Sequence, residues 1–173
     1  SKTYQFCQNF INTPDIFNNI ENIRNFPVFM KPDIGYGSRG AKKINSISEG
    51  FEHIKQFPSS IILEYLPGKE FTVDCFTNRH GKLLFTGARE RKRIQNGISV
   101  HTAPVENKDA FLKIAEQINE ELEFRGAWFF QVKENIKGEL ILLEIASRLA
   151  GSSSLYRNLG VNFALLSVYD AFE

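Results

Sequence analysis

The sequence predicts an α+β protein in two parts, and three observations support this. Short apolar runs typical of buried strands alternate along the chain with segments whose apolar residues recur at helical spacing. Pro67-Gly68 ends one such run and separates a smaller part, residues 1–66, from a larger part, residues 67–173. In the larger part, successive strand patterns joined by turn residues indicate an antiparallel sheet. A chain of 173 residues is long enough for two such lobes.

The smaller part is expected to alternate helices with strands. Pro14 separates the first two helices, and Ser46 with Glu49 forms a capping box that begins the third, which ends before Pro58. Apolar runs bounded by proline and glycine define the strands. The expected helices are 2–10, 15–25 and 47–56, and the expected strands are 28–31, 41–44 and 61–66.

The larger part is expected to begin with a hairpin. Two strand patterns flank turn residues from Asn78 to Gly81, and a regular helical repeat of apolar residues follows farther along the chain. A serine-rich loop separates the last strand from a final helix. The expected strands are 71–76, 82–88, 100–105, 127–133 and 139–145, and the expected helices are 108–123 and 162–172.

Composition limits the classes of function. The formal net charge is +1, which gives no sign of a nucleic-acid-binding surface. The two cysteines, Cys7 and Cys75, lie in apolar settings and form no metal-binding or disulfide pattern. No apolar run approaches the roughly 18 residues of a membrane span. We therefore expect a soluble, cytoplasmic protein without nucleic-acid or membrane partners, and helical patterns that run into both ends indicate a fragment of a longer chain.

The segment from Lys31 to Gly40 gives the first indication of function. A short strand ends in Lys31 and runs into Gly35, Gly37 and Gly40. Glycines at this spacing let backbone N–H groups surround an anion, because no Cβ blocks the approach. The lysine supplies positive charge for phosphate oxygens. The segment is therefore a candidate nucleoside triphosphate site.

Three alternatives compete with a triphosphate site. The glycine spacing also satisfies the dinucleotide-binding fingerprint, but a strand-like piece at 41–44 follows where that fingerprint needs a helix. A protein kinase would need an HRD-type catalytic loop and a DFG triplet, which the sequence lacks. A glycine-rich surface turn without a ligand is the third alternative.

A second candidate site lies in the sheet of the larger part. Glu144 interrupts an apolar strand, and a carboxylate there is costly to bury unless it is paired or bound to a cation. If the preceding loop has two or four residues, strand alternation places Gln131 on the same face. Carboxylate and amide oxygens suit Mg²⁺, so the two side chains form a candidate metal site. Alternatively, Glu144 pairs with Lys133, Arg148 or another cation and binds no metal.

Arginines extend this polar region. Arg148 precedes a loop of small residues and is suited to hold phosphate oxygens as charge develops in phosphoryl transfer, although a solvated arginine that caps a turn fits the local sequence equally well. Arg89, Arg91 and Arg93 share one face of an extended strand, where they are candidates to bind an anionic substrate. A solvated strand edge is the alternative for these three.

Taken in order, these motifs resemble the ATP-grasp superfamily, most closely the ATP-binding domain of the carbamoyl-phosphate synthase large chain. The resemblance covers essentially the whole chain. Phe26–Pro32 looks like the family's strand with a terminal basic residue, and Gly68-Lys69-Glu70-Phe71-Thr72-Val73-Asp74 is similar to its G-x-E-[YF]-[ST]-V-[DE] strand.

The resemblance implies roles for the candidate residues. In the family, basic residues hold phosphates, a mobile glycine loop closes over the β- and γ-phosphates, an inter-lobe segment meets the adenine, and a glutamate takes the ribose hydroxyls. In this chain the nucleotide-binding positions fall at Lys2, Lys31, Gly35, Gly37, Ser38, Gly40, Glu64, Tyr65, Leu66 and Glu70, the metal ligands at Gln131 and Glu144, and the phosphate-stabilising arginine at Arg148.

The resemblance also implies a fold and a reaction. The fold would be an ATP-grasp fold of two α+β lobes with antiparallel sheets that hold ATP between them, here without the N-terminal domain. With ATP and Mg²⁺ as cofactors, a carboxylate or bicarbonate would attack the γ-phosphate to give an acyl phosphate, which an amine or similar nucleophile then displaces. The expected partners are these small molecules and the flanking domains of the same chain, and a homodimer is left open.

One position departs from the family pattern. The last metal strand of the family usually reads Glu-x-Asn-x-Arg, with the asparagine as third ligand, but this chain has Ala146 at that place. Of two expected Mg²⁺ ions, one would be weakened, completed by water or absent. Two functions therefore stay open, a carboxylate-activating ligase and a weakly active or non-catalytic nucleotide-binding or regulatory module.

Overall fold

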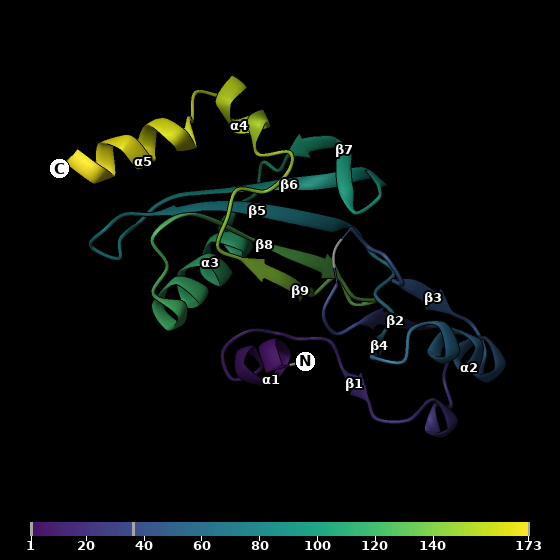
Figure 1. The fold of residues 1–173 in the computed structure, drawn as a ribbon. Coiled ribbons are helices and arrows are strands. Elements are labelled where there is room, and N and C mark those ends of the chain that lie inside the picture. The colour runs from purple at the N-terminus through teal and green to yellow at the C-terminus, as the bar shows by residue number, and fades with distance from the viewer. Residues whose placement is uncertain (1, 36, 173) are drawn as a thin grey trace. The chain divides into compact units, whose positions relative to one another are not determined.

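The structure, a computed structural model, describes residues 2–35 and 37–172 and confirms the α+β class (Figure 1). Tyr36, which belongs to the glycine-rich loop, and both terminal residues lie outside the described residues. The strands form two antiparallel sheets, a four-stranded sheet of order β1-β4-β2-β3 and a five-stranded sheet of order β7-β6-β5-β8-β9. The chain divides into two compact units, Ser1–Gly68 with Glu134–Ile141, and Lys69–Lys133 with Leu142–Glu173.

The first unit consists of the smaller sheet and the helices around it. Strand β2 pairs antiparallel with both β3 and β4, so it is an inner strand of this sheet. Its elements are α1 (Lys2–Cys7), β1 (Ile16–Phe17), the 3₁₀ turn η1 (Ile20–Asn22), β2 (Val28–Pro32), β3 (Lys42–Ile44), α2 (Ile47–Gln56) and β4 (Ser60–Glu64).

Most expected elements of this unit are confirmed, but the helix over 15–25 is wrong. That segment forms β1, where Ile16 pairs with Leu63 of β4, and then η1. The Asn19 side chain accepts a hydrogen bond from the backbone N–H of Glu21 at 3.0 Å and so begins the short turn. The apolar spacing that suggested a helix is satisfied instead by a sheet edge and a turn, because tertiary pairing outweighs local periodicity. Helix α1 also ends earlier than expected, at Cys7.

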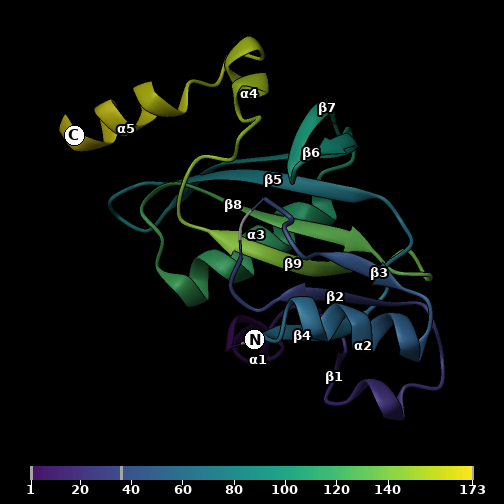
Figure 2. The same ribbon diagram turned by 45° about the vertical axis from the view of Figure 1, so that its right-hand side comes forward.

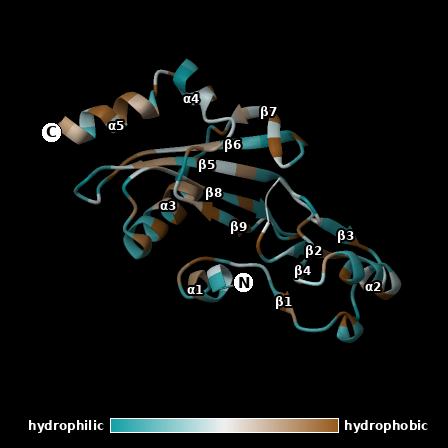
Figure 3. Ribbon diagram, viewed as in Figure 1, coloured by the Kyte–Doolittle hydropathy of each residue, from teal (hydrophilic) through white to brown (hydrophobic). Residues whose placement is uncertain are grey.

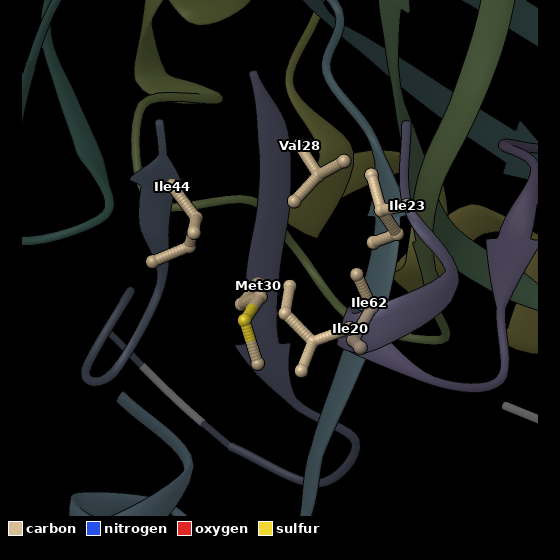
Figure 4. Close-up of a cluster of buried hydrophobic side chains, with 6 residues drawn as sticks. All are labelled: Ile20, Ile23, Val28, Met30, Ile44 and Ile62. Atoms are coloured by element: carbon tan, nitrogen blue, oxygen red, sulfur yellow. The ribbon is translucent and has the colours of Figure 1, made fainter. Parts of the chain in front are cut away.

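A cluster of buried aliphatic side chains holds the first unit together (Figure 4). Val28 and Met30 alternate on β2, where Val28 lies opposite Ile44 of β3 and Met30 lies opposite Ile62 of β4. Each side chain in the cluster is at most 7% exposed. This core fixes strand β2, whose last residues include Lys31. The members of the cluster are Ile20, Ile23, Val28, Met30, Ile44 and Ile62.

Helix α2 begins where the sequence predicts it. The Ser46 Oγ accepts the backbone N–H of Glu49 at 3.2 Å, and a Glu49 carboxylate oxygen accepts the backbone N–H of Asn45 at 2.8 Å. The other carboxylate oxygen lies 2.7 Å from Lys42 Nζ. These contacts, with the lysine hydrogen bond foremost, lower the pKa of Glu49 to about 2.

The second unit contains the larger sheet. Strand β6 continues to Gln95, beyond the expected end at residue 88, so the three candidate arginines of this region lie on one strand. A short helix, α4, forms where only a loop was expected. The elements are β5 (Glu70–Thr77), β6 (Leu83–Gln95), β7 (Ile98–Pro104), α3 (Asp109–Leu122), β8 (Gly126–Glu134), β9 (Leu140–Ala146), α4 (Ser154–Asn158) and α5 (Phe163–Phe172).

One face of the larger sheet is an apolar core covered by helix α3 (Figure 2). Helix α3 carries both hydrophobic and hydrophilic residues, as Figure 3 shows, and Phe111, Ala115 and Ile118 are its buried positions. The ring of Phe111 meets that of Phe71 edge to face, with 5.0 Å between centroids. Val73 follows Phe71 on the same face of β5 and is fully buried.

The opposite face of the same sheet is polar. Glu70, Thr72 and Asp74 alternate with the apolar residues of β5, so their side chains belong to this face. Thr72 lies opposite Gln131 on β8 and opposite Arg89 on β6. The register of three strands therefore collects the polar candidates that are scattered along the sequence.

Both cysteines are free and buried, as expected. Within residues 2–35 and 37–172, no helix combines the length and the hydropathy that a membrane span requires.

The contacts of Glu49 predict how stability depends on pH. Because the folded pKa of about 2 is below the ordinary value of 4.5, ionised Glu49 stabilises the fold above pH 4.5, and this contribution disappears as pH falls toward 2. The difference in unfolding free energy between the wild type and Glu49→Gln should therefore shrink over this range, measured by urea unfolding at several pH values. The control is Glu52→Gln, which removes an exposed carboxylate of the same helix that makes no capping contact. A difference that stays constant from pH 6 to pH 2 would contradict the assignment.

Candidate functional site

The centre of the polar face is a cluster of Glu70, Arg91, Gln131 and Lys133. The Arg91 Nη1 lies 3.1 Å from Glu70 Oε1 and donates a hydrogen bond to the side-chain oxygen of Gln131. The Lys133 Nζ lies 3.5 Å from the other oxygen of Glu70. Glu70 and Lys133 are direct partners across β5 and β8, so strand register brings them together. Glu70, Arg91 and Gln131 were predicted from three separate motifs, and the sheet makes them neighbours.

Arg91 is the most tightly held residue of the cluster. Its Nη2 donates to the backbone carbonyl of Gly97 at 2.6 Å, and the side chain is only 4% exposed. Burial lowers the pKa of Arg91, and the negative charges of Glu70 and Glu144 oppose this shift. Glu144 therefore lies close enough for its charge to act on Arg91.

Arg89 and Arg93 differ sharply from Arg91. The Arg89 Nε donates to Asp74 at 2.7 Å, and both side chains of this pair are 2% exposed. Burial raises the pKa of Asp74, and the adjacent guanidinium counteracts the rise. Arg93 is exposed. The three arginines predicted as one substrate-binding group thus occupy three different environments.

Arg148 also reaches the polar face. Its guanidinium lies over the ring of Phe129, 4.9 Å from the centroid, and its Nη1 donates to the backbone carbonyl of Leu149 at 3.0 Å. Phe129 precedes Gln131 by two residues on β8, so the two side chains share a face. The cation–π contact orients Arg148 over the face that carries the cluster.

The relation of Gln131 to Glu144 depends on the connection between β8 and β9. Residues 135–139 separate the two strands, a longer connection than the two- or four-residue loop on which the alternation argument rests. Glu144 is exposed on β9. The condition for the shared face is therefore not met, and the shared face of these two residues stays a prediction.

In the first unit, Lys31 is held by a residue that the sequence analysis did not single out. Its Nζ donates to the Tyr4 hydroxyl at 2.8 Å and lies 5.1 Å from the centroid of the Tyr4 ring. Tyr4 is buried in α1, so it forms a fixed support for the ammonium group. Lys2 begins the same helix and is exposed. The local sequence gave no signal for this contact, because 20 residues separate the end of α1 from the start of β2.

Three residues of the glycine loop have a left-handed backbone. Gly37, Ser38 and Gly40 have φ values of 61°, 56° and 73°, a left-handed region that favours glycine. A Cβ at Gly40 would lie 2.9 Å from the Phe57 ring, so this position has no room for a side chain. Gly35 lies 3.6 Å from Pro32 by the same measure and has ordinary space.

The segment predicted to meet adenine begins at the last residue of β4. The Glu64 carboxylate accepts the backbone N–H of Asp15 at 3.3 Å, and burial raises the pKa of Glu64. The Tyr65 ring lies under Lys43, whose Nζ is 4.6 Å from the centroid. Leu66 is 5% exposed. Of the three side chains of this segment, only that of Leu66 is therefore buried.

The oxygen ligands available for a metal ion are few. Within the described ranges 2–35 and 37–172, no group of three or more His, Cys, Asp and Glu side chains comes together. Gln131 has its side-chain oxygen against Arg91, and Ala146 contributes no ligand atom. The exposed Glu144 carboxylate is the candidate that remains accessible.

Comparison with known proteins agrees with the fold. The family model described as "ATP-grasp in the biosynthetic pathway with Ter operon" matches residues 56–173. The D-alanine–D-alanine ligase of Fusobacterium nucleatum subsp. nucleatum is 33% identical over 159 residues, which cover 84% of this chain and 54% of the ligase.

Solved structures share the fold at lower sequence identity. The biotin carboxylase domain of Hydrogenobacter thermophilus 2-oxoglutarate carboxylase has a TM-score of 0.80 at 16% identity, over 99% of this chain and 45% of that one. An L-amino acid ligase from Bacillus licheniformis has a TM-score of 0.69 at 17% identity, over 99% and 46%. The chain thus spans about half the length of the relatives it matches.

The buried pair of Asp74 and Arg89 predicts a large effect on stability. Asp74→Asn leaves the Arg89 charge buried without its counter-charge and should cost about 3–5 kcal/mol of unfolding free energy. The double variant Asp74→Leu with Arg89→Met removes both charges and should cost less than Asp74→Asn alone. Urea unfolding monitored by circular dichroism measures both values.

The exposed pair of Lys55 and Glu52 provides the control for this experiment. Its atoms lie 2.6 Å apart, close to the spacing in the buried pair, but both side chains are more than half exposed. Glu52→Gln should therefore change the free energy by less than about 0.5 kcal/mol. If Asp74→Asn costs no more than Glu52→Gln, burial of the pair does not have the assigned effect.

Proposed function

Since the chain belongs to the ATP-grasp family, we propose that it is the nucleotide-binding part of an ATP-dependent ligase that activates a carboxylate as an acyl phosphate for attack by an amine. The observation that carries the proposal is the 33% identity to a D-alanine–D-alanine ligase across 84% of the chain. The similarity to an L-amino acid ligase points the same way. Amino acids, which carry both a carboxylate and an amine, are therefore the first substrate class to consider.

The residues fit this function by their chemistry. Lys31, supported by Tyr4, presents a fixed ammonium to the α-phosphate, with Lys2 as a second phosphate-binding cation. The loop of Gly35, Gly37, Ser38 and Gly40 presents backbone N–H groups to the β- and γ-phosphates. The segment of Glu64, Tyr65 and Leu66 would meet the adenine, and the Glu70 carboxylate the ribose hydroxyls.

A magnesium ion fits the residues only in part. The exposed Glu144 carboxylate suits one ion that is otherwise held by water and phosphate oxygens. Gln131 would bind the same ion only after releasing Arg91. Bound Mg²⁺ would neutralise charge on the phosphates. Ala146 removes the third oxygen that the family pattern provides, so a second ion lacks ligands.

The chain's own part in the reaction is to position groups and balance charge. Arg148, oriented by the Phe129 ring, would place a guanidinium against the phosphoryl group as negative charge shifts during transfer. No covalent nucleophile is required of the protein, because the substrate carboxylate attacks the γ-phosphate itself. Among the predicted substrate-binding arginines of β6, Arg93 is exposed and could meet an anionic substrate from solvent. Arg89 is less suited, because its side chain is paired with Asp74.

Two finer alternatives belong to the same proposal. A carbamoyl-phosphate synthase-like reaction would use bicarbonate as the carboxylate. A weakly active or non-catalytic nucleotide-binding module is favoured by a specific observation, the combination of Ala146 with a Gln131 oxygen that already faces a cation. We expect flanking domains to complete the substrate site, and a homodimer is a further expectation prompted by the dimer of the biotin carboxylase domain.

The test is carboxylate-dependent release of ADP by the full-length protein. A panel of D- and L-amino acids and bicarbonate should include a carboxylate that raises ADP formation above the rate with ATP alone. Glu144→Gln should lower kcat/KM by about 100-fold, because it removes a charged ligand that acts in phosphoryl transfer. The exposed Glu116 on α3 supplies a control, since Glu116→Gln should leave the rate unchanged.

Two results would contradict the ligase. Failure to bind ATP at all would exclude every form of the proposal. Clear ATP binding without ADP release from any carboxylate or bicarbonate would favour the non-catalytic module.

A further inference from the structure

The Arg91 guanidinium is buried on the polar face of the sheet and held from three sides. Its Nη1 meets Glu70 and Gln131, and its Nη2 meets the backbone carbonyl of Gly97. These partners come from β5, β8 and the turn after β6, so three separate segments fix one planar group. A guanidinium in such a frame loses little freedom when it binds a further group.

One donor of this guanidinium is left over. The Arg91 Nε is buried and has no hydrogen-bond partner within residues 2–35 and 37–172. A buried N–H without an acceptor is costly, and native proteins usually satisfy such donors. A ligand oxygen would satisfy it with a charge-assisted hydrogen bond once neighbouring side chains move aside.

The charges around Arg91 favour an anionic ligand. Among the groups in ion-pair contact, Glu70 carries one negative charge, whereas Arg91 and Lys133 each carry a positive charge, so this inner set retains positive charge. Burial keeps water from screening it. The negative charge of Glu144 acts on Arg91 without an ion-pair contact, and it is the charge that a single bound Mg²⁺ would neutralise. The other two arginines of β6 lack this combination, since Arg89 is neutralised by Asp74 and Arg93 is exposed.

The contacts that hold Arg91 also conflict with a site for two metal ions. Gln131 directs its side-chain oxygen at the Arg91 guanidinium, and a divalent cation on that oxygen would be repelled by the neighbouring positive charge. Ala146 offers no oxygen at the third position. Of the three ligands implied by the family pattern, Glu144 alone is unobstructed.

We propose that Arg91 is a fixed cation of the nucleotide site that takes the place of one Mg²⁺ ion and binds a phosphate oxygen of ATP. Gln131, Glu70 and the carbonyl of Gly97 position it, and Gln131 acts on Arg91 rather than on a metal ion. The inference rests on the proposed nucleotide-binding function. Its consequence is that ATP binds with a single divalent ion and retains measurable affinity when no divalent ion is present.

The first measurement needs no variant. The full-length wild type is saturated with ATP and titrated with Mn²⁺, and bound Mn²⁺ is counted by electron paramagnetic resonance. We expect one Mn²⁺ per bound ATP. Two Mn²⁺ per ATP would overturn the role of Arg91, whereas a wild type that binds no ATP under any condition would overturn the proposed function as well.

The second measurement is calorimetric titration with ATP in the presence of EDTA. Arg91→Met should weaken this metal-free binding by roughly 10- to 100-fold, the worth of a hydrogen bond to a charged group. Lys92→Met is the matched control, because it removes the same charge from an exposed neighbour on the same strand, and it should change binding less than about twofold. Equal weakening by both variants would overturn the proposal, since only a general loss of charge would then be at work.

The role of Gln131 separates the two models directly. Gln131→Met should weaken ATP binding in EDTA, because Arg91 loses its support, and should leave the Mn²⁺ affinity of the ATP complex unchanged. A metal ligand would behave in the opposite way, with Mn²⁺ affinity reduced and metal-free binding unchanged. That opposite result would overturn the proposal.

A complementary pair of variants tests the exchange of cations. Ala146→Asn alone should still bind one Mn²⁺ per ATP, because Arg91 continues to occupy the Gln131 oxygen. The double variant Ala146→Asn with Arg91→Met should bind two. A second ion in Ala146→Asn alone would show that Arg91 does not exclude it and would overturn the proposal.

Discussion

The ion pair between Asp74 and Arg89 is the constraint on which the polar face of the larger sheet depends. Both side chains are almost fully buried, so each charge is tolerable only because the other lies 2.7 Å away. The pair joins β5 to β6, whose register places Thr72 opposite Arg89. A shift by one residue would turn every polar side chain of a strand toward the apolar core. The pair therefore favours the single alignment in which a charged face and an apolar face coexist on one sheet.

That alignment determines what the other charged residues do. With Arg89 matched to Asp74, the next inward arginine, Arg91, falls beside Glu70 and Gln131. Arg93 lies beyond a register shift and is exposed. Three arginines at alternate positions of one strand thus have different roles. Arg89 is a buried counter-ion, Arg91 is a buried cation held by several partners, and Arg93 is a surface charge. The three arginines differ in burial and in partners, which depend on their positions in the sheet and not on residue type.

In the proposed nucleotide site, phosphate binding and charge balance are linked. A family pattern with an asparagine on the last strand supplies ligands for metal ions, whereas this chain has Ala146 there and a guanidinium against Gln131. In the proposed site, part of the positive charge at the phosphates is carried by the protein rather than by a second bound ion. A fixed guanidinium differs from an ion in that it cannot dissociate and needs no octahedral oxygen shell. Under the proposed function, the Arg91 guanidinium replaces one bound Mg²⁺ ion as a source of positive charge.

Local patterns in the sequence were sufficient for much of the fold. The capping box at Ser46 predicted the start of α2, periodicity predicted α3, and alternation with turn residues predicted the strands of the larger sheet. These signals depend on residues that are close in sequence, so they can be recognised without knowing how the rest of the chain folds. The prediction of a helix over 15–25 was wrong because the apolar residues of this segment contact β4 and the core cluster, whose other members are distant in sequence.

The sequence by itself predicted which residues are candidates for chemistry: Lys31 with its glycine loop, Glu70, the arginines, Gln131 and Glu144. Only the tertiary structure decided which of them are partners. The contacts of Tyr4 with Lys31, of Arg91 with Gln131 and of Arg148 with Phe129 join segments that are far apart in the chain. The physical reason is that strand register and burial set both distance and dielectric around a charge, and neither is a property of the local sequence.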